Sequence, residues 1–269
     1  MNRISHAIQK LYEMENYATQ ECFLNSLNSL AKLIVTVAYL ITVISVPKYD
    51  VTRVAGMVMY PLVCLLISEF PIWQTVRKTR YILPIVILMG IANPWIDTRS
   101  ITQIGQVTIT GGILSWITLM VKGFLTVLSA YLFIMTTTID SLCQTLCRLH
   151  IPEVLVNVIW LTFRYLYVLL LETEKLIQAY ALRAPGQRGI HIKVWGSLVG
   201  QLLLRSIDRA QEVYQSMELR GYGYGVTSQR EKEHFKGKDW LWTGSWLIAF
   251  VIIHRYPVYE MLGQILMYK

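Results

Sequence analysis

The chain has 269 residues, of which 54% are apolar and 16% are charged, and its mean hydropathy is +0.42. This composition argues against a water-soluble globule, and it excludes a disordered chain because so few charges cannot keep so much apolar surface in water. The net charge of +8 fits basic loops beside membrane spans better than it fits nucleic-acid binding. We therefore expect an all-α, polytopic membrane protein that binds the lipid bilayer and no nucleic acid.

Four apolar windows in the first half of the chain predict membrane spans, because a bilayer core about 30 Å thick needs about 20 apolar helical residues. A further window follows near the carboxyl end, with aromatic residues at both of its borders. The windows cover residues 30–46, 54–68, 81–91, 112–136 and 240–256. The sequence therefore predicts about five transmembrane helices.

The basic residues between the windows predict the orientation of these helices. Arg77, Lys78 and Arg80 lie between the second and third windows, whereas the loop at 97–106 carries one acid and one base. Under the positive-inside rule the basic loop is cytoplasmic, and so is the amino terminus. The predicted organisation is a cytoplasmic segment (1–29), four transmembrane helices (30–137), a cytoplasmic module (138–238) and a last transmembrane helix (239–269).

The module at 138–238 contains many apolar and many charged residues. We expect it to form two to three helices that pack against another surface. A short helix begins near Asp140, with Leu142, Leu146 and Leu149 on one face. A second begins at Pro152 and runs to Arg183, and a third ends near Arg220. The apolar first half of the second helix, residues 154–171, fits a helix lying along the inner face of the membrane, and a spanning helix is the alternative.

Residues for catalysis or metal binding are not clustered in this sequence. Five histidines are scattered singly, and Cys143 and Cys147 lack a neighbouring third ligand, so they are better explained as small buried side chains. The phosphate-binding pattern GxxxxGK[ST] does not occur. We therefore expect a protein that is not an enzyme, with no cofactor and no metal site of its own, so that any ATP is bound by partner subunits.

Two helix ends share a short pattern, Leu182-Arg183-Ala184 and Leu219-Arg220-Gly221. Each places one arginine in the last turn of a helix beside a small residue. Favourable interaction of a cation with the helix dipole explains either one alone. Taken together, they suggest two prongs that point the same way.

Several short segments occur in an order and spacing that resemble the transmembrane (T) component of energy-coupling factor importers, the CbiQ/EcfT family. The resemblance covers nearly the whole chain and is closest to the cobalt and nickel type. The segments are Leu30-Ala31-Lys32-Leu33, Ile91-Ala92-Asn93-Pro94, Leu149-His150-Ile151-Pro152, Phe163-Arg164-Tyr165 with Glu172, Leu204-Arg205-Ser206, and Met217-x-Leu219-Arg220-Gly221.

The resemblance implies a scaffold in the bacterial plasma membrane whose two coupling helices dock on two ATPase subunits. The residues that match the docking pattern are Leu182, Arg183, Ala184, Leu219, Arg220 and Gly221, with Arg188 as a second candidate for the first helix. Motion of the ATPases would pass through these helices to a substrate-capture membrane subunit.

That capture subunit would be an S component or a CbiM-like protein, with or without a small CbiN-like protein. It is expected to contact Leu142, Leu146, Leu149, Leu155, Ile159, Leu166 and Leu169. Internal packing is the alternative for these side chains. The implied cargo is cobalt or nickel. A T component for vitamins and an independent secondary transporter stay as alternatives. A secondary transporter would be expected to have charged or broken helices at mid-membrane and an internal repeat.

Overall fold

The computed structural model describes residues 9, 13, 15, 17–19, 22–68, 72–80, 83–91, 95, 100–104, 107–187, 189–222 and 235–255. The chain divides into two compact units. The bundle unit comprises residues 17–141 and 233–269, and the two-helix unit comprises residues 1–16 and 142–232. Each unit is described by itself.

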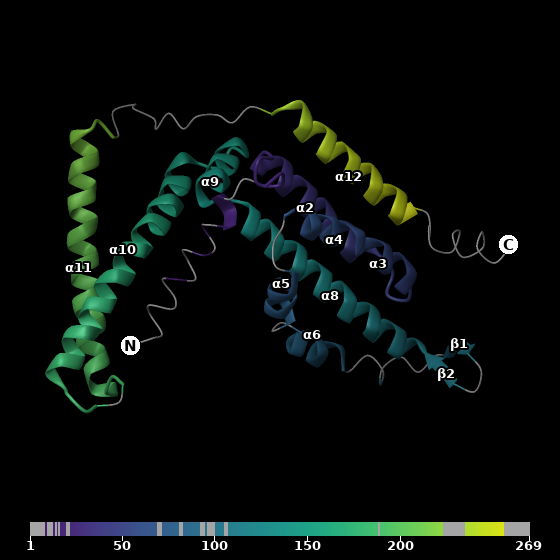
Figure 1. Cartoon of the computed structure of the whole chain (residues 1–269), viewed down its shortest axis with the longest axis horizontal. Helices are drawn as coiled ribbons and strands as arrows, with labels where there is room; N and C mark the ends of the chain where they lie inside the picture. Colours follow the sequence, from purple (N-terminus) through teal and green to yellow (C-terminus); the bar gives the residue numbers. More distant parts are fainter. Residues whose placement is uncertain are drawn as a thin grey trace. The chain divides into compact units, whose positions relative to one another are not determined.

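The bundle unit is built from helices and one short β-hairpin (Figure 1). Its elements are α2 (Ser29–Ser45), α3 (Val51–Met57), α4 (Met59–Ile67), α5 (Ile72–Thr79), α6 (Leu83–Gly90), β1 (Ser100–Ile104), β2 (Val107–Thr110), α8 (Gly111–Thr136) and α12 (Gly237–Arg255). The predicted helical fold is confirmed in outline. The antiparallel β1–β2 pair departs from the all-α prediction, because the loop before α8 contains alternating β-branched residues that favour strands.

Among the described residues, α8 and the later helix α10 are long and apolar enough to cross a membrane by length and composition. The α2 helix and the α3–α4 segment are apolar but shorter. The number of five transmembrane helices therefore stays a prediction.

The second apolar window is broken at Val58, between α3 and α4. Pro61 explains the break, because proline has no N–H to donate to the carbonyl of Met57 four residues earlier. That carbonyl instead accepts a hydrogen bond from the Tyr39 hydroxyl of α2 at 3.0 Å. The proline thus leaves an acceptor that joins the second window to the first helix.

Aromatic side chains pack the last helix, α12, against α2 and α4. Tyr60 lies at the centre of the cluster, with its ring 4.7 Å from Tyr39, 4.9 Å from Trp246 and 5.4 Å from Phe250. The centroid distances and tilted or edge geometries are those that favour ring pairs. Phe250 and Tyr39 are fully buried, so α12 is a packed member of the bundle.

Two lysines tie α2 to α8 at opposite ends of their contact. Lys32 of α2 donates to the carbonyl of Thr136 at the end of α8, at 2.6 Å. Lys122 of α8 donates to the carbonyls of Val46 and Ile44 at the end of α2. Helix C-termini leave carbonyls without helical partners and are negative ends of the helix dipole. The ionisable Lys122 within the fourth window therefore has a structural partner.

The second unit contains two long helices, which follow the short helix α9 (Ile139–Arg148) along the chain (Figure 1). The first is α10 (Glu153–Arg183), which begins one residue after the predicted start because Pro152 is its N-cap, and which has Glu153 in its first turn. The second is α11 (Ile192–Leu219), where the Nδ1 atom of His191 accepts the N–H of Lys193 at 3.3 Å. The three helices predicted for the module are present.

Candidate functional site

The helices α10 and α11 form an antiparallel pair, which is defined by three contacts along its length. Glu172 meets Arg205 at 2.7 Å, and the Arg209 guanidinium lies 5.9 Å from the Tyr165 ring centre. Farther from the turn, the Asn157 amide donates to the Tyr222 hydroxyl at 3.2 Å. As the residue number increases along α10, the number of its partner on α11 decreases, so the two helices run in opposite directions.

The antiparallel pairing corrects the expectation that the two arginine tips point the same way. Arg183 lies at the turn that joins the helices, whereas Arg220 lies at the open end of the pair (Figure 1). The α11 helix has 28 residues, which is about 42 Å at 1.5 Å per residue. The two tips are therefore on opposite ends, because one short turn reverses the chain between two helices of similar length.

The first tip is closed by a β-turn. Ala184 is the C-cap residue that follows the helix, and it donates its N–H to the carbonyl of Tyr180 at 3.1 Å. The next turn runs from Ala184 to Gln187 with a 3.3 Å hydrogen bond, and it has Pro185 second and Gly186 third with φ of 91°. This is the pattern of a type II turn, which requires a positive φ at its third residue. Arg188, the alternative residue for this tip, lies outside the described residues.

The second tip ends in a Schellman motif. The N–H of Tyr222 donates to the carbonyl of Met217 at 3.0 Å, and that of Gly221 donates to Glu218 at 2.9 Å. Gly221 has φ of 83°, the left-handed conformation that such a C-cap needs and that glycine adopts without strain. The C-cap of α11 therefore explains why a glycine follows Arg220 in this pattern.

We predict that Gly221→Ala destabilises this helix end by about 1 kcal/mol, because a Cβ is strained in the left-handed region. Hydrogen exchange of the last α11 amides should accelerate, with little change elsewhere. Gly196→Ala is the matched control, since Gly196 lies within α11 and an added Cβ meets nothing within 4 Å. That variant should exchange as slowly as the wild type or more slowly, and equal exchange rates for the two variants would contradict the prediction.

Both tips present an uncovered leucine next to an uncovered arginine. Leu182 is 84% exposed and Leu219 is 90% exposed, while Arg183 and Arg220 are exposed as well. Within the part of the chain that the structure describes, neither arginine has an ion pair or side-chain hydrogen bond. An exposed apolar side chain beside a free guanidinium is suited to a partner that offers a groove and acceptor oxygens.

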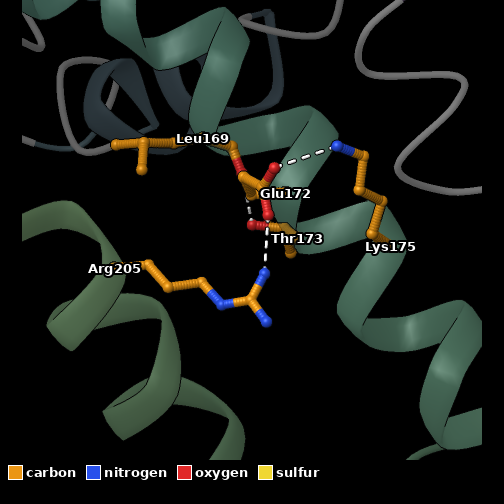
Figure 2. A network of polar contacts seen from close by, with 5 residues as sticks. All are labelled: Leu169, Glu172, Thr173, Lys175 and Arg205. Carbon is orange, nitrogen blue, oxygen red and sulfur yellow. Dashed lines mark hydrogen bonds and ion pairs between the residues drawn. The ribbon is translucent and has the colours of Figure 1, made fainter. Parts of the chain in front are cut away.

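A polar network connects the two helices near the middle of α10 (Figure 2). The Glu172 carboxylate accepts from Lys175 Nζ at 3.0 Å on its own helix and from Arg205 at 2.7 Å on α11. These hydrogen bonds, from Lys175 first and Arg205 second, hold the pKa of Glu172 below its ordinary value. The spacing of three residues along one helix favours the pair of Glu172 with Lys175. The sequence did not indicate Arg205, because a contact between helices depends on their register.

The leucines and isoleucine expected at the capture-subunit surface differ in exposure. Leu149, Leu155 and Leu166 are exposed, and the other four are half-buried. Their assignment to the capture-subunit surface stays a prediction.

A stripe that the sequence analysis missed lies on α11 and comprises Trp195, Val199, Leu203 and Ile207, all exposed. Its spacing of four residues is a signal in the sequence itself.

No group of three or more His, Cys, Asp or Glu side chains close enough to hold a metal ion occurs among the described residues. The site is therefore described by its two tips and by the network between them.

Comparison with known proteins identifies the family. The model of CbiQ, described as a cobalt transport protein, matches residues 20–232. The chain belongs to the CbiQ family. This CbiQ protein is also 24% identical over 250 residues to an uncharacterised protein of Methanocaldococcus jannaschii, covering 88% of this chain and 84% of the relative. It is 28% identical over 132 residues to the nickel permease LarQ of Lactiplantibacillus plantarum, covering 49% and 48%.

Membership of this family, together with the apolar helices, makes the chain a membrane protein and a transporter component rather than a catalytic enzyme. The resemblance noted from the sequence is thereby confirmed. The matched range includes both α10 and α11 with their arginine tips.

Proposed function

We propose that this CbiQ protein is the transmembrane coupling subunit of an ATP-driven importer of the energy-coupling factor type. The observation that supports this most is the pair of exposed Leu-Arg tips, Leu182-Arg183 and Leu219-Arg220, at the ends of α10 and α11. Each tip docks in a groove of one ATPase subunit, where the leucine fills the groove and the guanidinium binds carboxylate or carbonyl oxygens.

The spacing of the tips supports two separate docking partners. An antiparallel pair about 42 Å long presents one tip at each end, so a pair of ATPase subunits can each hold one. When the ATPases bind ATP and close, the two ends of the helix pair are displaced together. The helices transmit this motion to the membrane subunit that captures the substrate, which is a rigid-body mode of switching.

The cargo in this proposal is cobalt or nickel ion. The family description names cobalt transport, and one relative is named a nickel permease. The capture subunit, an S component or a CbiM-like protein, holds the ion and contacts the apolar face of α10. ATP is bound by the ATPases, and this chain needs no cofactor. The tips face the cytoplasm of a multi-pass plasma-membrane protein, as the basic loop at Arg77–Arg80 indicates.

An independent transporter is less well supported, because the ionisable group inside the fourth window already has partners. Lys122 donates to backbone carbonyls at the end of α2. A transport pathway would need such a group to be available to solute.

Co-purification and uptake test the proposal together. The tagged full chain, extracted from its own host in mild detergent, is expected to bring down two ATPase subunits and a membrane capture subunit. Cells that contain the complex should accumulate radiolabelled cobalt or nickel, and an inhibitor of ATP synthesis should stop this. Uptake by the purified chain alone in proteoliposomes would favour the independent transporter, and absence of ATPase subunits from the extract would contradict the coupling role.

A further inference from the structure

The two helices of the α10–α11 pair are held with very little buried apolar surface between them. Among the described residues of α10 only Val156 is buried, and α11 has no buried residue. Interlocking core side chains normally fix the register of two packed helices. The register of α10 and α11 must therefore be fixed by another kind of contact.

Polar contacts lie along one face of α10 and supply that register. Asn157, Tyr165 and Glu172 are separated by eight and seven residues, which is about two helical turns each, and so they share a face. Their partners are Tyr222, Arg209 and Arg205. In this set Glu172 with Arg205 is the ion pair, and it joins the helices at 2.7 Å.

The Glu172 carboxylate is held in place before it meets the other helix. Lys175 on the same helix binds one oxygen at 3.0 Å, and Arg205 binds the other at 2.7 Å (Figure 2). The glutamate side chain is 28% exposed and the Arg205 side chain 50% exposed. At this exposure an ion pair fixes a geometry and can still break reversibly. Lys175 keeps the carboxylate paired if Arg205 leaves.

We infer that Glu172 and Arg205 are positioning residues that hold α10 and α11 in one register, so that the pair moves as one body when its Arg183 and Arg220 tips are displaced. This inference rests on the proposed coupling function. If the link is lost, each tip still docks on its ATPase subunit, but the helices slide or splay under load. ATP hydrolysis then continues while less motion reaches the capture subunit.

Three variants separate this role from general damage to the fold. Glu172→Gln removes the negative charge. Glu174→Gln is the matched control, because Glu174 lies on the same helix and forms no ion pair among the described residues. The triple variant Glu172→Arg, Lys175→Glu, Arg205→Glu rebuilds the network with all signs reversed. Rescue by the triple variant distinguishes an ion pair from a site where any change is harmful.

The measurements use the intact complex in membranes. Metal uptake per ATP hydrolysed should fall about five- to tenfold in Glu172→Gln, in the range of coupling changes caused by residues that touch no ligand. It should return towards wild type in the triple variant and stay unchanged in Glu174→Gln. Wild-type coupling in Glu172→Gln would overturn the inference, and so would a triple variant no better than Glu172→Gln.

Spin labels report the register without relying on transport. They are attached to cysteines introduced at the exposed Gln178 and Gln215, after the four native cysteines have been replaced. Their distance distribution should broaden in Glu172→Gln or shift by about one turn, 5.4 Å. The triple variant should narrow it again, and an unchanged distribution would overturn the inference. Failure of the wild type to retain ATPase subunits would instead overturn the proposed function, and the spin-label result would stand apart from it.

Discussion

Replacing both tip arginines, Arg183→Ala with Arg220→Ala, is expected to abolish metal uptake while the chain still inserts in the membrane. Neither side chain has a partner among the described residues, so the fold loses no contact when they are truncated. An arginine at the centre of an interface typically contributes about 2 kcal/mol or more, which is about thirtyfold in affinity for each tip. The measurement is uptake of radiolabelled cobalt or nickel together with the amount of ATPase subunit that co-purifies.

The matched control for lost charge is Arg53→Ala, because Arg53 forms a partly exposed pair with Asp50 at 3.6 Å in the bundle unit. It should transport normally, since such pairs contribute about 0–1 kcal/mol. Arg220→Lys should give an intermediate loss, because lysine keeps the charge but lacks the planar fork of donors. Normal uptake by the double alanine variant would remove the basis of the coupling proposal.

Most of the helices could be predicted from hydropathy because each apolar window ends at a clear signal. The window at 30–46 ends before Pro47 and corresponds to α2. The helix predicted from Pro152 to Arg183 corresponds to α10, which begins one residue later. The break at Val58 was missed, although Pro61 marks it. A proline inside an apolar window either kinks a helix or interrupts it, and which occurs depends on whether a partner such as Tyr39 satisfies the freed carbonyl.

The ends of the two helices could be predicted from the sequence, and their relative directions could not. The tips could be found because an arginine before a glycine or an Ala-Pro-Gly segment marks a helix end. Their opposite directions depend on the chain reversal between Gly186 and Gly189, both with positive φ, and on the register of α10 and α11. The partner of Glu172 depends on the same register. These are contacts between residues 33 apart in the sequence, which spacing along one helix cannot indicate.

Asp239→Ala is expected to destabilise the bundle unit strongly. This side chain is 2% exposed, and its carboxylate accepts the N–H of Asn28 at 3.0 Å and the N–H of Lys236 at 2.8 Å. Those two N–H groups belong to the N-termini of α2 and α12, which are positive dipole ends. One carboxylate therefore satisfies two helix starts, in the manner of a capping box whose second donor comes from another helix.

Truncation removes two hydrogen bonds, of which the one from Asn28 is buried and the one from Lys236 is partly buried, at a cost of about 2–3 kcal/mol. The midpoint temperature of thermal unfolding in detergent should fall by roughly 5–10 °C. Asp239→Asn should lose about half as much, because one oxygen can still accept while the amide nitrogen faces a donor. Asp50→Ala is the matched control: Asp50 precedes α3 but its side chain makes no capping hydrogen bond, so its melting temperature should stay close to wild type. Equal melting of Asp239→Ala and Asp50→Ala would show that the carboxylate does not join α12 to α2.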